Sequence, residues 1–196
     1  MKFFDYLEEK IGNDFAVVYT GRFCPPHNGH LNVFKKLQQK FGDDKVFILT
    51  SDKSATSPLT FDEKVELFKM YGVNPAFVKQ MSSSGYNGPA MIKSIGKSEM
   101  SGLVVAIGEK DKDRLKIDGL TKTGNPTYFR TYTGEVALPS SEAGYVFIIK
   151  NEMSGEKIIS ATTVREAIKD NNYEIVKEYM PEKMFNKAKE FLSSAP

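Results

Sequence analysis

The sequence predicts an α/β fold, in which a parallel sheet of five strands has helices on both faces and a helical C-terminal tail. Two observations support this prediction. Short runs of β-branched and aromatic residues alternate with segments whose apolar residues recur every three or four positions. The spacing between successive runs also matches a strand–helix–strand unit, which joins neighbouring parallel strands. We expect the 196 residues to form a single domain, with an insertion at about 109–144 and the tail at about 161–196.

Five apolar runs are the predicted strands. Each is short, and a run without polar alternation is typical of a strand that is buried on both faces. The runs are FAVVYT (15–20), KVFILT (45–50), AFVKQ (76–80), LVVAIG (103–108) and YVFIIK (145–150), of which the third is the weakest. The polar segment 109–144 is longer than an ordinary connection, which indicates a functional role.

Amphipathic segments between and after these runs are the predicted helices. The apolar face of the helix after the first strand consists of Leu31, Phe34, Leu37 and Phe41. Gly42 offers an end for this helix. Thr60 and Glu63 have the spacing of a capping box at the start of the next one. Further helices are expected over 3–11, over 88–97, and as two or three helices in the tail.

Composition excludes several classes of protein. The 27 basic and 25 acidic residues give a net charge of +2, which is too balanced for a dedicated nucleic-acid binder. No apolar run reaches the ~18–20 residues that a membrane-spanning helix needs. Cys24 is the single cysteine, so no internal disulfide can form, which suits a reducing compartment. We therefore expect a cytoplasmic protein with no nucleic-acid or membrane partner, and the sequence leaves a homo-oligomer open.

The segment YTGRFCPPHNGH (19–30) follows the first predicted strand and opens the next helix. Ligands of open α/β sheets bind at this edge, beside helix N-termini whose free N–H groups favour anions. His27 and His30, the only two histidines, would share one face of the first turn. With Arg22 they make a site for phosphate oxygens. Gly21 permits a tight or left-handed turn, and Gly29 lets backbone and ligand approach closely. Zinc is the alternative, but two nitrogen ligands are too few and the sequence has no partner motif.

A second segment, ISATTVREAI (159–168), has the signature of a helix start far down the chain. Ser160, Thr162 and Thr163 are natural N-cap residues, and Thr163 with Glu166 has capping-box spacing. The hydroxyls and free N–H groups there can hold phosphate groups, to which Arg165 adds a charged fork. A plain capped helix is the alternative for this segment taken alone.

Together the two segments resemble the HxGH-motif nucleotidyltransferase superfamily, which includes cytidylyltransferases and nicotinamide mononucleotide adenylyltransferases. GRFCPPHNGH is similar to its G-x-F-x-P-x-H-x-G-H loop, to which Phe23 also belongs, and ISATTVR is similar to its I-S-x-T-x-x-R motif. SPLTFDEKVELF (57–68) looks like its NP-x-[ST]-x-x-E-R helix start, with Lys64 in the arginine's place. The resemblance covers about 15–180 and implies a Rossmann-like fold.

The resemblance implies transfer of a nucleotidyl group from a nucleoside triphosphate to a phosphate monoester, with release of pyrophosphate. It assigns catalysis to His27, His30 and Arg165, with His30 as the donor to the reacting α-phosphate. The implied phosphate-binding residues are Gly21, Arg22, Phe23, Gly29, Ser160, Thr162 and Thr163. Mg²⁺ would arrive with the triphosphate, without a dedicated set of protein ligands. The acceptor phosphate is already anionic, so catalysis would rest on positioning and charge stabilisation without a general base.

The choice of substrates rests on weaker patterns. By resemblance the segment from Gly108 to Asp111 (GEKD), which ends the fourth predicted strand, should border the base or ribose. Candidates for the acceptor site are Lys53, Arg114 and Arg130. Arg22 and Cys24 in the first loop look more like the adenylyltransferases than the cytidylyltransferases, so ATP, with an acceptor such as nicotinamide mononucleotide, is the first choice. The alternative is CTP with a polyol, amino-alcohol or sugar phosphate.

Two further interpretations come from other classes of protein. A fragment of a class I aminoacyl-tRNA synthetase shares the histidine motif, but no K-M-S-K-S-like loop replaces ISATTVR. A non-catalytic nucleotide-binding module would have less need of both motifs. We expect Cys24 to take no part in the reaction, because the implied chemistry needs no covalent intermediate. The aromatic residues of 109–144 could stack on a ring of the acceptor or pack that segment down, which we favour. They are Tyr128, Phe129 and Tyr132.

Overall fold

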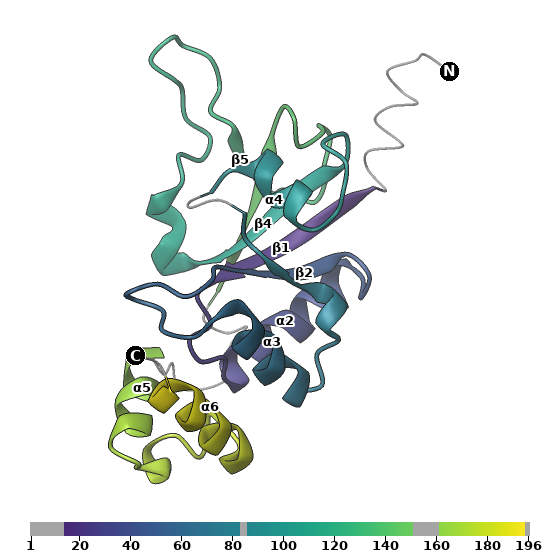
Figure 1. Ribbon diagram of the computed structural model, residues 1–196. Coiled ribbons are helices and arrows are strands. Elements are labelled where there is room, and N and C mark those ends of the chain that lie inside the picture. The colour runs from purple at the N-terminus through teal and green to yellow at the C-terminus, as the bar shows by residue number, and fades with distance from the viewer. Residues whose placement is uncertain (1–13, 83–85, 151–160, 195–196) are drawn as a thin grey trace.

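The computed structural model describes residues 14–82, 86–150 and 161–194, and a single parallel sheet runs through it (Figure 1). Its strands are β1 (Phe15–Gly21), β2 (Val46–Thr50), β3 (Val78–Gln80), β4 (Gly102–Gly108), β5 (Phe129–Thr131) and β6 (Gly144–Ile149). Their order across the sheet is β3-β2-β1-β4-β6-β5, and every neighbouring pair is parallel. The predicted Rossmann-like α/β class is confirmed.

The predicted number of five strands is wrong, because the sheet has a sixth strand, β5, inside the 109–144 segment. β5 has three residues and pairs with β6, from Phe129 opposite Gly144 to Thr131 opposite Val146. Its sequence, FRT, has one buried apolar residue, Phe129, and lies within a segment rich in polar residues, so the apolar run that revealed the other strands is missing here. The segment expected to be an insertion therefore contributes to the sheet itself.

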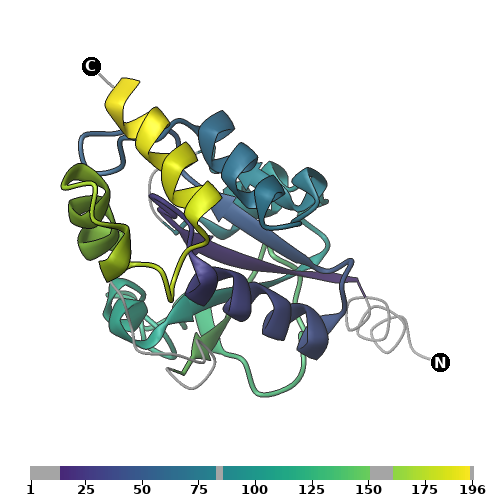
Figure 2. The same cartoon turned by 90° about the horizontal axis from the view of Figure 1, so that it is seen from below.

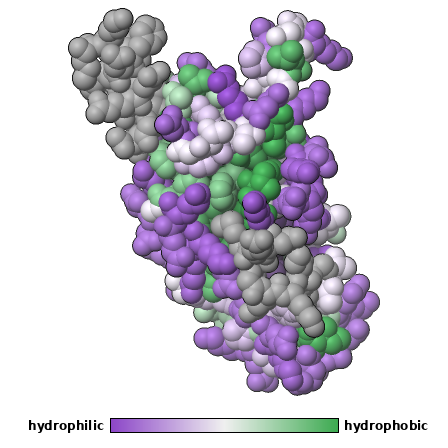
Figure 3. Space-filling model, turned by 180° about the vertical axis from the view of Figure 1, so that it is seen from behind, coloured by the Kyte–Doolittle hydropathy of each residue, from purple (hydrophilic) through white to green (hydrophobic). Residues whose placement is uncertain are grey.

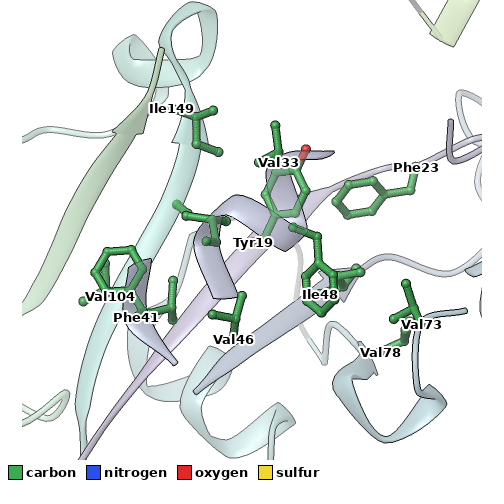
Figure 4. Packing of buried hydrophobic residues seen from close by; sticks show 14 of the residues in the cluster. Tyr19, Phe23, Val33, Phe41, Val46, Ile48, Val73, Val78, Val104 and Ile149 are labelled. Atoms are coloured by element: carbon green, nitrogen blue, oxygen red, sulfur yellow. The ribbon is translucent and has the colours of Figure 1, made fainter. Parts of the chain in front are cut away.

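Helices cover both faces of the sheet, as predicted. α2 (Asn28–Phe41) and α3 (Phe61–Met70) lie on one face, and α4 (Gly88–Ser94) lies on the other. Because side chains alternate along a strand, Val17 and Val18 of β1 point into two different cores. Figure 4 shows the core under α2 and α3, where Tyr19, Phe23 and Ile48 pack together from β1, the loop after it and β2.

The tail forms helices, as predicted, and packs beside α3, in an apolar cluster of its own. It consists of α5 (Ala161–Lys169), a 3₁₀ turn η4 (Tyr173–Ile175) and α6 (Glu182–Ser194). Figure 2 shows α6, in yellow, beside α3. The buried side chains of the tail share one apolar cluster with Leu67 of α3, Leu59 and Cys24. Leu59 follows β2 and Cys24 follows β1, so the tail lies against loops at the carboxyl edge of the sheet.

The chain leaves β1 and β4 in opposite directions. β1 leads through α2 to its neighbour β2, whereas β4 leads through a 3₁₀ helix, η2 (Glu109–Arg114), toward β6 on its other side. In open α/β sheets, ligands bind at the carboxyl edge where the connections diverge in this way. The loops that follow Gly21 of β1 and Gly108 of β4 are therefore the place to look for a site.

Several smaller expectations have different outcomes. The helix predicted over 88–97 ends at Ser94, and the first part of the strand predicted over 76–80 is a 3₁₀ turn, η1 (Pro75–Phe77). The helix predicted over 3–11 lies outside the described residues.

The surface is mixed in character. Seen from behind, it is mostly hydrophilic, with a hydrophobic band along the middle (Figure 3). In the described part of the chain, no helix is long and apolar enough to cross a membrane.

Candidate active site

The two histidines lie in contact at the start of α2. His27 is the N-cap residue, with extended backbone, and its N–H donates to Nδ1 of His30 at 3.3 Å. The two ring centroids are 3.7 Å apart. Because His30 Nδ1 accepts a hydrogen bond, its neutral ring carries the proton on Nε2. The geometry therefore makes His30 Nε2–H a hydrogen-bond donor that is held in place by the backbone.

Both rings are neutral at neutral pH. Burial, together with a smaller effect of the charge of Lys110, lowers the pKa of His27 to about 4. Burial, together with His27 and Lys110, holds the pKa of His30 well below its usual value. In the described part of the chain, the buried His27 Nδ1 has no hydrogen-bond partner, and such an unpaired group often marks a functional site.

Phe23 and Gly21, expected among the phosphate-binding residues, lie where the histidine loop meets the core. Phe23 has a positive φ of 43°, and its buried ring packs edge-on against His30 at 5.0 Å and Phe68 at 5.4 Å. A methyl group on Gly21 would lie 2.8 Å from Phe23 Cζ. Gly21 is therefore needed for the close approach of a core side chain.

Gly29 has a comparable role beside His27. A methyl group on Gly29 would lie 3.1 Å from His27 Cε1 and 3.2 Å from its Nδ1. The imidazole consequently rests on the backbone of the first turn of α2. Arg22, which lies between Gly21 and Phe23 in the sequence, is exposed. Its carbonyl accepts a hydrogen bond from Thr50 Oγ1 at 3.3 Å.

The second motif reaches the first through Arg165. Its Nη1 donates to the carbonyl oxygen of Cys24 at 2.8 Å, and its Nη2 donates to Thr162 Oγ1 at 3.2 Å. Cys24 lies three residues before His27, so the structure brings the guanidinium to the histidine loop. Thr162 and Thr163 are exposed at the start of α5, and Ser160 lies outside the described residues.

The start of α2 is less open to an anion than the sequence suggested. The backbone N–H of Asn28 donates to the carbonyl of Tyr179 at 2.8 Å, and the Asn28 side chain donates to the carbonyl of Glu178 at 3.3 Å. The first N–H of the helix is therefore satisfied by the segment between α5 and α6. What α2 offers a ligand is mainly the pair of imidazoles.

Lys110 belongs to the GEKD segment that the resemblance placed beside the base or ribose, but its electrostatic link to the histidines was not predicted from the sequence. It lies in η2, just after Gly108, and its charge acts on both histidines. The run EKDKDR reads as a solvated stretch of alternating charge, and Lys110 is indeed exposed. Apart from the resemblance, the only signal that could have identified it is its place at the end of β4, beside the point where the connections diverge.

The three candidates for the acceptor lie in different places. Lys53 is exposed, and its backbone N–H donates to Asp52 Oδ1 at 2.7 Å. Arg114 ends η2 and pairs through Nε with Asp111 at 3.2 Å. Arg130 lies on β5 opposite Tyr145, which pairs with Val104 of β4. This register places Arg130 below the carboxyl edge and three strands away from β1, so the structure does not bring it to the histidines.

Lys64 is a buried cation behind the histidine loop. Its Nζ donates to the carbonyl of Ser51 at 2.7 Å, and burial lowers its pKa, while the charges of Asp52 and Glu63 oppose that shift. Because Ser51 directly follows β2, the lysine ties α3 to the carboxyl edge of the sheet. No group of three or more histidine, cysteine or acidic side chains that could hold a metal ion is found among the described residues.

An all-parallel sheet whose carboxyl edge gathers imidazole, ammonium and guanidinium groups has the architecture of the nucleotidyltransferase superfamily. The model of the cytidylyltransferase-like family matches residues 18–123, which is more than half of the sequence, and the chain belongs to that family. A second model, of the citrate lyase ligase C-terminal domain, matches residues 127–187.

Solved structures agree with this fold at low sequence identity. The nicotinic acid mononucleotide adenylyltransferase of Plasmodium falciparum, complexed with NaAD, has a TM-score of 0.58 at 13% identity, and the match covers 91% of this chain and 96% of that chain. A putative nicotinate-nucleotide adenylyltransferase from Vibrio parahaemolyticus has a TM-score of 0.53 at 13% identity, with 89% and 98% covered. Thermotoga maritima TmcAL, bound with alpha-thio ATP, has a TM-score of 0.54 at 11% identity, with 91% of this chain and 56% of that chain covered.

Proposed function

We propose that this protein transfers AMP from ATP to an anionic oxygen of a small acceptor, first of all a phosphate monoester such as nicotinamide mononucleotide, with release of pyrophosphate. The observation that supports this best is the contact between the histidine loop and Arg165, which assembles neutral and charged donors at one edge of the sheet. Three of the structural neighbours support the choice of the adenylyl group, since two are nicotinate-type adenylyltransferases, one of them putative, and the third is bound with alpha-thio ATP.

In the proposed reaction, an acceptor oxygen attacks the α-phosphorus and the bond between that phosphorus and the bridging oxygen to the β-phosphate breaks. Pyrophosphate leaves with the electron pair. The acceptor is already an anion at neutral pH, so no residue has to remove a proton. His30 Nε2–H would donate to an α-phosphate oxygen, where charge develops, and Arg165 with Lys110 would offset the charge of the leaving group.

Mg²⁺ fits this site as a companion of the nucleotide. The groups at the site are donors, and Mg²⁺ prefers oxygen ligands, so triphosphate oxygens and water would hold the ion rather than protein side chains. When bound there, Mg²⁺ would stabilise the charge of the triphosphate.

The second family match favours another candidate acceptor. Residues 127–187 match the C-terminal domain of citrate lyase ligase, and a ligase that uses ATP can join AMP to a carboxylate before the acyl group moves on. The attacking atom is then a carboxylate oxygen, while the role of the histidines at the α-phosphate stays the same. A CTP-dependent cytidylyltransferase and a non-catalytic nucleotide-binding module complete the alternatives.

The test is a pyrophosphate-release assay with ATP or CTP against a panel of phosphate monoesters and short carboxylic acids. Hydroxylamine in the carboxylate arm would trap an acyl adenylate as a hydroxamate. Turnover with ATP and a phosphate monoester is the expected result. Hydroxamate formation would establish a carboxylate as the acceptor. ATP binding without turnover of any combination of nucleoside triphosphate and acceptor would defeat the enzymatic proposal.

A further inference from the structure

Lys64 of α3 is a buried cation to which the proposed reaction gives no role. The residue is 0% exposed, and it lies one turn after the N-cap Thr60, near the positive end of the helix dipole. Burying an ammonium group lowers stability, and a place near a helix start adds to that cost. A feature that lowers stability is expected where it serves function. The packing of α3 alone therefore does not account for a lysine at this position.

The charges around Lys64 do not require the lysine for balance. Asp52 and Glu63 act on the ammonium electrostatically. Asp52 is exposed, however, and accepts a hydrogen bond from the backbone N–H of Phe61 at 2.9 Å. Glu63 accepts from the backbone N–H of Thr60 in the capping box at 2.7 Å. Removal of the lysine charge would therefore leave neither carboxylate buried and unpaired.

The hydrogen bond of Lys64 fixes the start of α3 to the sheet. Its Nζ donates to the carbonyl of Ser51 at 2.7 Å, and Ser51 directly follows the last residue of β2. Phe68 lies one turn further along α3, on the same face as Lys64, and is buried as well. The lysine thus determines how closely Phe68 approaches the core behind the histidine loop.

Phe68 reaches the histidines through the ring of Phe23. The ring centroids of Phe68 and Phe23 are 5.4 Å apart, those of Phe23 and His30 are 5.0 Å apart, and both pairs meet edge-on. Phe23 points into the core (Figure 4) and has a positive φ of 43°, which a residue other than glycine keeps only where its surroundings fix it. A shift of α3 would therefore pass to the Phe23 ring and from there to His30.

We propose that Lys64 is a positioning residue for His30, which acts through α3 and the two phenylalanine rings without touching the substrate. The inference rests on the proposed nucleotidyl transfer only for the role of His30 as donor to the α-phosphate. It assigns a purpose to the buried charge. The ammonium holds the start of α3 to a carbonyl of the sheet, and the rings transmit that position to the imidazole.

The test compares two substitutions on the same helix. Lys64→Met keeps the length of the side chain and removes its charge and its donors, whereas Lys69→Met removes an exposed charge and is the matched control. Proton NMR follows the His30 ring, because the chain has only two imidazoles and His27→Gln assigns them. Lys64→Met should displace the His30 signals and leave the melting temperature unchanged or higher. Lys69→Met should change neither.

Turnover provides a second measurement for the same variants. In Lys64→Met, kcat should fall by about 10–100-fold with the affinity for ATP unchanged, since a misplacement of ~1 Å can cost about 10²-fold. Phe68→Leu keeps the lysine and removes one ring contact, so it should displace the His30 signals by itself. Adding Lys64→Met to Phe68→Leu should displace them little further, because changes within one chain of contacts are not additive.

Fully additive displacements in the double variant would overturn the inference, as would His30 signals that are unchanged in Lys64→Met or in Phe68→Leu. A lower melting temperature of Lys64→Met, or its failure to fold, would make the lysine a structural residue and have the same consequence. An active Lys64→Met enzyme with normal kcat would also contradict the proposal. Absence of turnover in the unmodified protein with every acceptor defeats the proposed reaction alone, because the NMR and melting measurements need no turnover.

Discussion

Arg165 of α5 donates a hydrogen bond to the backbone carbonyl of Cys24 across 141 positions of the chain. The acceptor lies in the loop that carries His27 and His30, so one side chain ties the tail to the histidines. The other terminal nitrogen of the guanidinium holds Thr162. Arg165 thus orders the loop and supplies positive charge at the same edge of the sheet.

The first prediction concerns this arginine. Arg165→Ala should lower kcat/KM for nucleotidyl transfer by about 10–100-fold, since hydrogen bonds to charged groups contribute about 1.5–3 kcal/mol. Arg165→Lys should recover only part of the loss, because an ammonium cannot reproduce the planar fork. Steady-state pyrophosphate release measures both effects. Lys169→Ala, on the same helix, is the matched control. An equal loss of kcat/KM in that variant would mean that the effect of Arg165 comes only from its positive charge.

The second prediction separates binding from turnover at His30. Its neutral Nε2–H is placed to donate where charge develops, so His30→Ala should lower kcat by about 10²–10³ and change ATP binding little. His30→Gln should recover part of the rate, because its amide offers a neutral donor. Single-turnover kinetics and a separate ATP titration give the two quantities. If kcat and the affinity for ATP fall by the same factor, the His30 donor acts in the ground state as well as in the transition state.

The third prediction is a pH dependence of stability. The unfolded histidines titrate near 6.5, while the pKa of folded His27 is about 4 and that of folded His30 is well below its usual value. As pH falls from about 6.5 toward 4, the unfolded state binds protons that the folded state does not, so stability should decrease. The slope should approach about 1.4 kcal/mol per pH unit for each histidine.

Chemical denaturation at several pH values measures this slope, and His27→Gln should reduce it by about half. Proton NMR offers a second test, because the chain has only two imidazoles to follow. The His27 signal should titrate near 4 and shift to a higher midpoint in Lys110→Ala, which removes a nearby positive charge. A midpoint near 6.5 in the unmodified protein would contradict the burial of both rings.

The fourth prediction contrasts two glycines of the same loop. Gly29→Ala crowds the His27 ring at 3.1 Å but improves helix propensity, so it should reduce turnover with little loss of stability. Gly21→Ala brings a methyl group to 2.8 Å from the buried Phe23 ring and should lower the melting temperature. Differential scanning calorimetry with rate measurements separates the two cases. Equal melting temperatures for the two variants would refute the core role of Gly21.

Much of the fold could be predicted, because most of the strands are buried on both faces and therefore appear as apolar runs. β5 escaped prediction because its sequence, FRT, has a single buried apolar residue inside a polar segment. Phe129 packs against Tyr128 and is buried, in agreement with the expectation that it packs its own segment down.

The candidate site was predicted less completely than the fold. The histidines and Arg165 stand out because residue type and spacing reveal them. The contact from Tyr179 to the start of α2 could not be foreseen, since a backbone carbonyl has no signature in the sequence. Lys110 was placed near the nucleotide by resemblance, as part of GEKD, but its effect on the histidines could not be foreseen, because its neighbours are charged residues that resemble a solvated loop.

Cys24 is 1% exposed and lies where the histidine loop meets the apolar cluster of the tail. As the sole thiol of the chain, it is a natural reporter of the junction between these parts. A thiol reagent can reach Cys24 only when the tail separates from the loop. The rate of labelling therefore measures how often this local opening occurs. A nucleotide that bridges the loop and Arg165 should slow the labelling. Cys24 thus reports closure of the junction between the loop and the tail without any added probe.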